Sequence, residues 1–201
     1  MADFSQVADE ELVSLVKEGE SAAFDELFER YKAKIFSFVR RYVRDNETAE
    51  DIFQKTFIRL YTKAGYFKRE SKFSTWLYTI AANLCRDELK KRKVRQHVSM
   101  DGNPLIGRNG KNIPAIGEKL TANLNGPRSD AERKEITFFV RNAVYELPED
   151  LRTVITLHGL ERLKYREVAE ILGIPVGTVQ SRMHTALSKL REKLQSLKPS
   201  Q

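Results

Sequence analysis

The sequence has little of several features that mark other classes of protein. Cys85 is the only cysteine among 201 residues, so an internal disulfide is excluded, and it has no cysteine or histidine beside it at metal-ligand spacing. No run approaches the roughly 18 to 20 apolar residues of a membrane-spanning helix. The start of the chain, with Asp3, Asp9, Glu10 and Glu11, lacks the basic beginning of a signal peptide. We therefore expect a cytoplasmic protein without membrane insertion, in which Cys85 fills part of a core.

Two structural patterns are also missing, namely internal repeats and alternating apolar runs long enough for a β-strand. What is present is 41% hydrophobic and 31% charged residues, which is typical of a globular protein that folds in water. The length suits one large or two small domains, because one core is typically served by about 100 to 150 residues. We expect an all-α fold of two small helical domains, each with its own core.

Positive charge exceeds negative charge, and its distribution is uneven. The net charge of +7 makes an anionic partner plausible. Residues 1–30 contain nine acids and two bases, whereas residues 63–95 contain ten bases and three acids. The two stretches are therefore expected to face different partners.

Three helices are predicted in the first part of the chain. Apolar residues recur at helical spacing over Phe24–Tyr42, and again over Ala49–Tyr61 after capping residues that include Asp45. Ser74 can cap a third helix that ends in the basic string Lys90–Lys93.

The composition changes between the two halves. Residues 96–133 contain five of the ten glycines, three of the six prolines and no aromatic residue. This stretch is predicted to be a flexible linker between a first domain at 1–95 and a second at 134–201.

Four helices are predicted in the second half. A capping-box pattern at Ser129–Glu132 opens the first, and Glu149–His158 forms the next, with Gly159 able to close it. Tyr165–Leu172 and a final helix marked by the apolar residues of Val179–Leu194 follow.

The last two helices have the layout of a DNA-binding helix-turn-helix. Val168 and Leu172 can pack against Val179 and Met183, and Gly173 allows the tight corner between the helices. A basic protein with this motif is expected to bind duplex DNA in the major groove.

Thr178 is expected to cap the second helix of this motif, which places its exposed residues where side chains reach base edges. Arg166, Lys189 and the backbone amides near Thr178 would meet phosphates. The alternative for Arg182 is an ordinary solvated surface charge. The candidates for base contacts are Gln180, Ser181, Arg182, His184 and Thr185.

A second candidate site alternates aromatic and basic residues. Aromatic faces stack on unpaired bases, each worth roughly 1 to 3 kcal/mol, while lysine and arginine follow the phosphate backbone. The alternative is that Phe73 and Trp76 belong to the core. The stretch comprises Tyr66, Phe67, Lys68, Arg69, Ser71, Lys72, Phe73, Trp76 and Tyr78.

Four motifs in order along the chain point to one family. The sequence resembles the extracytoplasmic-function (ECF, group 4) sigma factors of the sigma-70 family, the small two-domain subunits that give bacterial RNA polymerase its promoter specificity. The resemblance spans nearly the whole chain. The motifs are Ala23–Phe28 with Tyr31, Ala49–Phe57, Phe73–Asn83, and Leu147–Arg152 followed by Val176–Arg182.

The resemblance implies the partners and their sites. Residues up to about 95 are similar to sigma region 2 and those from about 134 to region 4, with the linker directed towards the active-site and RNA-exit channels of the polymerase. Asp51, Gln54 and Phe57 match the face that docks on the clamp helices of the polymerase large subunit. Members of the family commonly have anti-sigma inhibitors, so an anti-sigma factor is a further expected partner.

By the same resemblance, Phe67, Phe73 and Asn83 match a pocket for a flipped base of the melted minus 10 element. Such a base needs an aromatic wall and an amide that donates and accepts hydrogen bonds. The alternative is that the Asn83 side chain has a structural role and forms its hydrogen bonds with a neighbouring backbone group. The minus 10 candidates together are Phe67, Lys68, Ser71, Phe73, Trp76, Asn83, Lys90 and Arg92.

The sequence departs from the family pattern at four positions. Lys55 replaces a usual acid, Gln180 a common base, and Thr185 and Leu187 frequent arginines. Polymerase docking is therefore expected to be retuned, and fewer phosphate contacts by the helix-turn-helix should lower its affinity for DNA.

We expect a sigma factor that binds core polymerase and promoter DNA. A free-standing helix-turn-helix regulator is the alternative, but it leaves residues 66–78 unexplained. Against an enzyme, His97, His158 and His184 lie in different segments without a nucleophile, metal or phosphate-loop motif. We expect no catalytic residue, cofactor, metal or small-molecule substrate.

Overall fold

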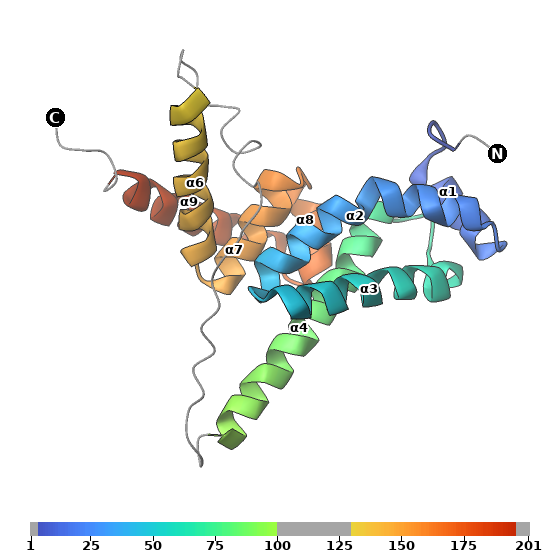
Figure 1. Ribbon diagram of the computed structural model, residues 1–201, viewed down its shortest axis with the longest axis horizontal. Coiled ribbons are helices and arrows are strands. Elements are labelled where there is room, and N and C mark those ends of the chain that lie inside the picture. The colour runs from blue at the N-terminus through green and yellow to red at the C-terminus, as the bar shows by residue number, and fades with distance from the viewer. Residues whose placement is uncertain (1–3, 100–129, 196–201) are drawn as a thin grey trace.

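The computed structural model describes residues 4–99 and 130–195, and side chains over 4–95 and 138–195. Most of the predicted linker, 96–133, lies outside these ranges. Every regular element within them is a helix, as the apolar periodicity predicts (Figure 1). The elements are α1 (Asp9–Lys17), α2 (Ser21–Val43), α3 (Asn46–Lys63), η1 (Ala64–Tyr66), α4 (Phe73–Ser99), α6 (Asp130–Glu146), α7 (Glu149–Ile155), η2 (Thr156–Leu160), α8 (Tyr165–Leu172) and α9 (Val176–Gln195).

Helix α1 is an element that the apolar periodicity did not predict. Its first turn contains three acids, which complement the positive end of the helix dipole, and one face is buried. Asp9 also accepts hydrogen bonds from Arg30, at 2.7 Å, and from the Tyr31 hydroxyl. Part of the acidic start of the chain therefore binds α2 within the fold.

The starts of α3 and α4 are set by specific polar groups. Asp45 caps α3 as predicted, because its carboxylate accepts from the Thr48 N–H at 2.9 Å. The predicted Ser74 cap is wrong, since α4 begins one residue earlier at Phe73. Glu10 of α1 instead accepts from the Phe73 N–H at 2.9 Å.

Helix α7 continues into η2, which is a π-helical turn. The Glu161 N–H donates to the Thr156 carbonyl at 3.1 Å, and Arg162 then ends the segment in the left-handed region with φ 57°. Gly159 lies inside this turn, so the prediction that it closes the helix is wrong. The wide turn sets the position of Glu161.

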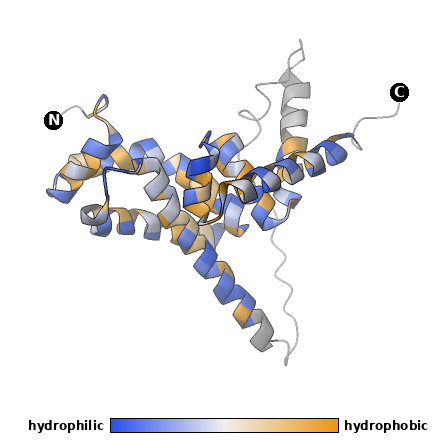
Figure 2. Ribbon diagram, turned by 180° about the vertical axis from the view of Figure 1, so that it is seen from behind, coloured by the Kyte–Doolittle hydropathy of each residue, from blue (hydrophilic) through white to orange (hydrophobic). Residues whose placement is uncertain are grey.

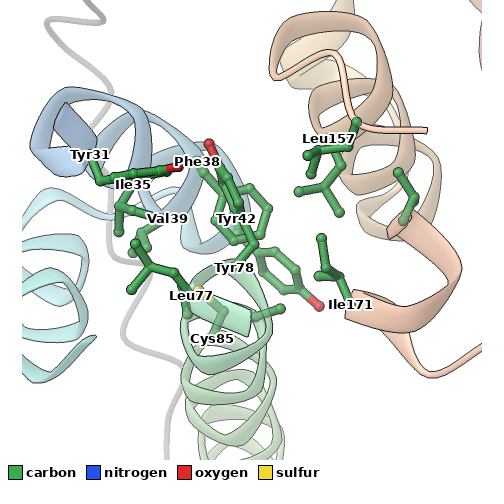
Figure 3. Packing of buried hydrophobic residues seen from close by; sticks show 14 of the residues in the cluster. Tyr31, Ile35, Phe38, Val39, Tyr42, Leu77, Tyr78, Cys85, Leu157 and Ile171 are labelled. Carbon is green, nitrogen blue, oxygen red and sulfur yellow. The ribbon is translucent and has the colours of Figure 1, made fainter. Parts of the chain in front are cut away.

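The buried residues form one continuous core rather than the two separate cores expected. In Figure 3, Phe38 and Tyr42 of α2 and Tyr78 of α4 face Leu157 of η2 and Ile171 of α8. The packing of α4 on α8, which are far apart in the sequence, extends the core of the first half into the second.

The C-terminal part of α4 extends away from the packed helices (Figure 1). Figure 2 shows this part mostly in hydrophilic colours, and Lys90, Lys91, Lys93 and Arg95 are exposed. A solvated basic helix surface is therefore available to a phosphate backbone.

None of the described helices is long and apolar enough to cross a membrane.

Candidate nucleic-acid interface

Helices α8 and α9 form the predicted helix-turn-helix. Gly173 has φ 65°, a left-handed conformation that glycine adopts without strain, and it ends α8. Val168 and Ile171 of α8 and Val179 and Met183 of α9 are buried between the helices. The pair therefore has a fixed crossing that presents the outer face of α9.

Helix α9 begins at Val176, so Thr178 lies in its first turn and does not cap it as predicted. The Ser181 hydroxyl donates to the Thr178 carbonyl at 3.0 Å, and the Thr185 hydroxyl donates to the Ser181 carbonyl at 3.0 Å. The oxygens of both hydroxyls keep lone pairs for a ligand. The predicted residues that are exposed on or beside this helix are Arg166, Gln180, Ser181, His184, Thr185 and Lys189.

Arg182 is placed differently from its neighbours on α9. Its guanidinium lies 3.5 Å from the Asp150 carboxylate of α7, and its side chain is 32% exposed. A half-exposed pair of this kind is worth little in stability. Arg182 can therefore leave Asp150 for a nucleic acid at small cost.

An aromatic cluster lies at the start of α4. Phe67 packs on Trp76 with 5.4 Å between ring centroids, and both are partly exposed. Phe73 is fully buried behind them against Tyr31. An unpaired base that approaches this cluster would therefore stack on Phe67 and Trp76, with Phe73 as support.

Asn83 does not lie in this cluster. It is on the same continuous helix, ten residues beyond Phe73, and a rise of about 1.5 Å per residue separates the two by about 15 Å. Its Oδ1 accepts a hydrogen bond from the Arg86 guanidinium at 2.8 Å. The structure therefore does not bring Asn83 into one pocket with Phe67 and Phe73.

The remaining basic candidates and Ser71 differ in whether their side chains are free to contact DNA or are held by other residues. Lys68 and Lys90 are exposed, whereas Ser71 donates to the Lys68 carbonyl at 3.3 Å in a tight turn. Arg92 pairs with Asp45 at 3.0 Å. Hydrogen bonds from Thr48 and from Arg92 lower the pKa of Asp45, so Arg92 also supports the start of α3.

A groove of about 520 Å³ is lined by residues of α2 and α3. Gln54 and Phe57, two of the three predicted polymerase contacts, line it, while the third, Asp51, forms an exposed ion pair with Lys55 at 2.6 Å. Lys55 thus neutralises the acid that precedes it on the helix. The full lining is Phe24, Phe28, Phe53, Gln54, Phe57, Ile58, Tyr61 and Thr62.

Comparison with known proteins identifies the family. The sequence pattern of sigma-70 region 2 matches residues 27–95, and that of sigma-70 region 4 matches residues 140–190. The RNA polymerase sigma-H factor of Pseudomonas aeruginosa is 35% identical over 96% of this chain and 97% of its own length. The ECF RNA polymerase sigma-E factor of Escherichia coli is 35% identical over 96% and 97%. The chain belongs to the ECF sigma factors.

Solved structures agree on the fold of this sigma factor. CnrH, in complex with the cytosolic domain of CnrY, superposes with a TM-score of 0.63 at 20% identity over 94% of this chain and 99% of that one. Sigma factor RpoE of Bartonella quintana, in complex with the anti-sigma factor NepR, gives 0.65 at 22% identity over 87% and 98%.

Membership in this family decides between the functions considered from the sequence. An ECF sigma factor directs transcription initiation by RNA polymerase and is not an enzyme, and it is not a free-standing helix-turn-helix regulator. His158 contacts the Leu163 carbonyl at 2.8 Å and packs on Tyr165, whereas His184 is an exposed residue of α9.

The sequence analysis did not single out two exposed residues of this groove as candidates for binding. Ile58 and Tyr61 are 61% and 54% exposed, although Tyr61 was expected on the core face of its helix. Large apolar side chains that are exposed together mark interaction surfaces. The sequence signal was an apolar stripe on α3 too wide for one buried face. Cys85, by contrast, is fully buried as predicted, and burial raises the pKa of its thiol.

Proposed function

We propose that this sigma factor binds core RNA polymerase through the α3 groove and reads promoters with two separate surfaces. The exposed face of α9 recognises the minus 35 duplex, and the start of α4 with its basic extension binds unpaired bases at minus 10. Residues 1–95 and 134–201 are the two domains that carry these surfaces. Because polymerase and DNA share the cytoplasm, we place the chain there.

The observation that carries this proposal is the α3 groove. Ile58 and Tyr61 stand exposed beside Gln54, next to a set of phenylalanine rings that line the same groove. A regulator that works on duplex DNA alone has no use for this surface. A partner helix with apolar anchors, such as a polymerase clamp helix, would bury it.

An anti-sigma factor is the second proposed partner. RpoE and CnrH, which share the fold, were each solved in a complex, RpoE with the anti-sigma factor NepR. The same exposed surfaces that serve polymerase and DNA are available to an inhibitor that covers them.

The groove is tested by substituting two exposed tyrosines. Tyr61→Ala removes an apolar anchor from the groove and should weaken binding to core polymerase at least about tenfold. Tyr66→Ala is the matched control, because Tyr66 is 75% exposed and does not line the groove. Affinity is measured by titrating labelled core enzyme without DNA. Equal effects of the two substitutions would show that the groove is not the docking site.

A further inference from the structure

Helix α1 packs on η1 and on the start of α4, next to the aromatic cluster. The members of this cluster are Phe67, Phe73 and Trp76. The Glu10 carboxylate of α1 accepts a hydrogen bond from the Phe73 N–H at 2.9 Å, across 63 positions of sequence. The Asp9 carboxylate accepts from the Tyr31 hydroxyl, and the Tyr31 ring packs against Phe73. Phe73 is therefore held through its backbone and through its ring.

The Glu10 contact sets the start of α4. The first N–H groups of a helix have no partner within it, and an acid near that end also complements the helix dipole. The Trp76 N–H already donates to the Lys72 carbonyl at 3.1 Å. The Phe73 N–H instead donates to Glu10, which belongs to a different helix. Glu10 therefore fixes the place at which α4 begins relative to α1.

The Tyr31 contact sets the position of the Phe73 ring. Tyr31 is only 7% exposed, and the two rings meet edge to face with 5.2 Å between centroids. Burial and the hydrogen bond to Asp9 raise the pKa of the Tyr31 phenol, so the hydroxyl stays protonated and keeps donating. Asp9 is held in turn by Arg30 at 2.7 Å. The ring behind the cluster is thus fixed by α1 and α2 together.

Phe73 connects these contacts to the exposed part of the cluster. Its ring centroid lies 6.2 Å from that of Phe67 and 6.2 Å from that of Trp76. Phe67 and Trp76 are partly exposed and form the surface on which an unpaired base would stack. Closely packed rings do not shift independently of their support. A displaced Phe73 would therefore change the spacing and tilt of the surface that meets the base.

A fixed stacking surface matters for choosing a base more than for holding one. Every base has a face that stacks on an aromatic ring, so stacking alone tolerates all sequences. A base on fixed rings presents its edge groups at fixed positions to neighbouring polar groups, and only a matching base then satisfies them. Rings that shift would still stack the base but would discriminate less between bases.

We propose that Glu10 and Tyr31 are positioning residues for minus 10 recognition, acting through Phe73 on the rings that stack the base. The inference rests on the proposed function of the aromatic cluster. Both residues contact Phe73, which is buried behind Phe67 and Trp76, so they influence the choice of base without touching it. Helix α1 is thereby part of the minus 10 reader.

The location of these residues makes the expected effect selective. Glu10 and Tyr31 belong to α1 and α2, whereas α8 and α9 form the helix-turn-helix. Neither residue lines the α3 groove. Substitutions there should therefore alter the choice of minus 10 base, while affinities for the minus 35 duplex and for core enzyme stay within about twofold.

Base discrimination by the complex of core enzyme and full chain measures this role. The complex is titrated with single-stranded minus 10 oligonucleotides that carry each base in turn, and the discrimination ratio compares the preferred base with the next best. A lost helix cap changes an equilibrium constant by a factor of about 2 to 30, and Glu10→Ala should lower the ratio within this range. Glu11→Ala is the matched control, because Glu11 is an exposed acid in the same turn of α1, and it should leave the ratio unchanged.

Two conservative substitutions separate positioning from general stability. Glu10→Gln keeps an oxygen that can accept from the Phe73 N–H, so it should retain the discrimination ratio that Glu10→Ala loses. Tyr31→Phe removes the bond to Asp9 but keeps the ring, and it should lower the ratio by about twofold or more.

A purely structural role of these residues predicts a different pattern. Glu10→Ala and Tyr31→Phe would then unfold at a lower temperature and bind all four oligonucleotides less well by one common factor, with the discrimination ratio unchanged. That pattern, or a loss of discrimination of equal size with Glu11→Ala, would overturn the proposal.

Phe67→Ala distinguishes failure of this inference from failure of the proposed function. If the aromatic cluster stacks minus 10 bases, Phe67→Ala should weaken binding of every oligonucleotide at least about fivefold. Unchanged binding would overturn the proposed function of the cluster. Weaker binding with Phe67→Ala, together with unchanged discrimination by Glu10→Ala and Tyr31→Phe, would keep the proposed function and overturn the positioning role.

Discussion

At the scale of single residues, the contact between Arg86 and Asn83 fixes the orientation of a candidate base-reading group. Arginine only donates hydrogen bonds, so the amide oxygen must face Arg86, as the 2.8 Å contact has it. The amide NH2 is then the part left for a ligand. We infer that Asn83 favours a base atom that accepts a hydrogen bond.

Asn83→Asp tests this orientation with almost no change in shape. The aspartate keeps an oxygen for Arg86 but replaces the NH2 donors by an acceptor, so it should lose about 1 to 3 kcal/mol with the preferred base. Its preference should shift towards bases that donate. The measurement is binding of the polymerase complex to single-stranded minus 10 oligonucleotides with each base in turn. A lower melting temperature with an unchanged base preference would indicate a purely structural asparagine.

Arg182 is the one candidate of α9 with an ion-pair partner in its own half of the chain. Arg182→Ala should weaken binding at one or two minus 35 positions by about 1 to 3 kcal/mol if its guanidinium contacts a base. Asp150→Asn is the control, since it ends the 3.5 Å pair but keeps the guanidinium. Affinities for a set of singly substituted duplexes measure both. A loss of equal size on every duplex would mark a phosphate contact.

At the scale of secondary-structure elements, the corner between α8 and α9 determines how the DNA-facing helix is presented. Gly173 adopts φ 65° with no atom within 4 Å of where a Cβ would stand, so only backbone strain opposes a larger residue. Gly177, in the first turn of α9, also has open space but a normal helical conformation.

These two glycines predict opposite responses to the same substitution. Gly173→Ala should destabilise the chain by about 1 to 2 kcal/mol, because a left-handed conformation is strained with a Cβ. Gly177→Ala should stabilise it by up to about 1 kcal/mol, because alanine loses less entropy in a helix. Urea unfolding of both variants gives the comparison. Destabilisation of similar size in both would contradict a left-handed corner at Gly173.

The sequence predicts α2, α3, α4 and the helix-turn-helix because each has a repeating apolar face and recognisable end signals. Helix α1 is short, and its acids are explained only by Arg30 and Tyr31 of α2. The π-helical turn of η2 depends on packing, and no local signal marks Glu161 as buried. Contacts such as Glu161 with Tyr78 join residues 83 positions apart, which no helical periodicity indicates.

The candidate sites, too, could be predicted only where helical periodicity alone places the residues. Exposed polar residues of α9 followed directly from the motif, because an α-helix fixes which positions share a face. That Phe73 and Asn83 are too far apart to share one pocket could be seen only from the structure, in which both lie on one continuous helix, α4. The exposure of Tyr61 depends on how α2 packs on α3, where Phe24 is its aromatic neighbour, and this is a property of tertiary packing.

At the scale of the whole molecule, the three candidate binding surfaces are distributed over a chain whose described buried residues form one continuous core. The α3 groove is lined by residues of α2 and α3, whereas Lys72 and Glu167, each next to a candidate DNA-binding residue, form an ion pair that joins the two halves.

The central claim is that this chain gives core RNA polymerase the ability to start transcription at a bipartite promoter. The most direct measurement is transcription in vitro by purified core enzyme, with and without the chain. The templates are DNA sequences first selected for binding to the complex of core enzyme and chain. We predict initiation that requires the chain and is lost when either the minus 10 or the minus 35 element is scrambled. Sequence-specific binding of the chain to duplex DNA, with no binding to core enzyme and no initiation, would contradict the claim.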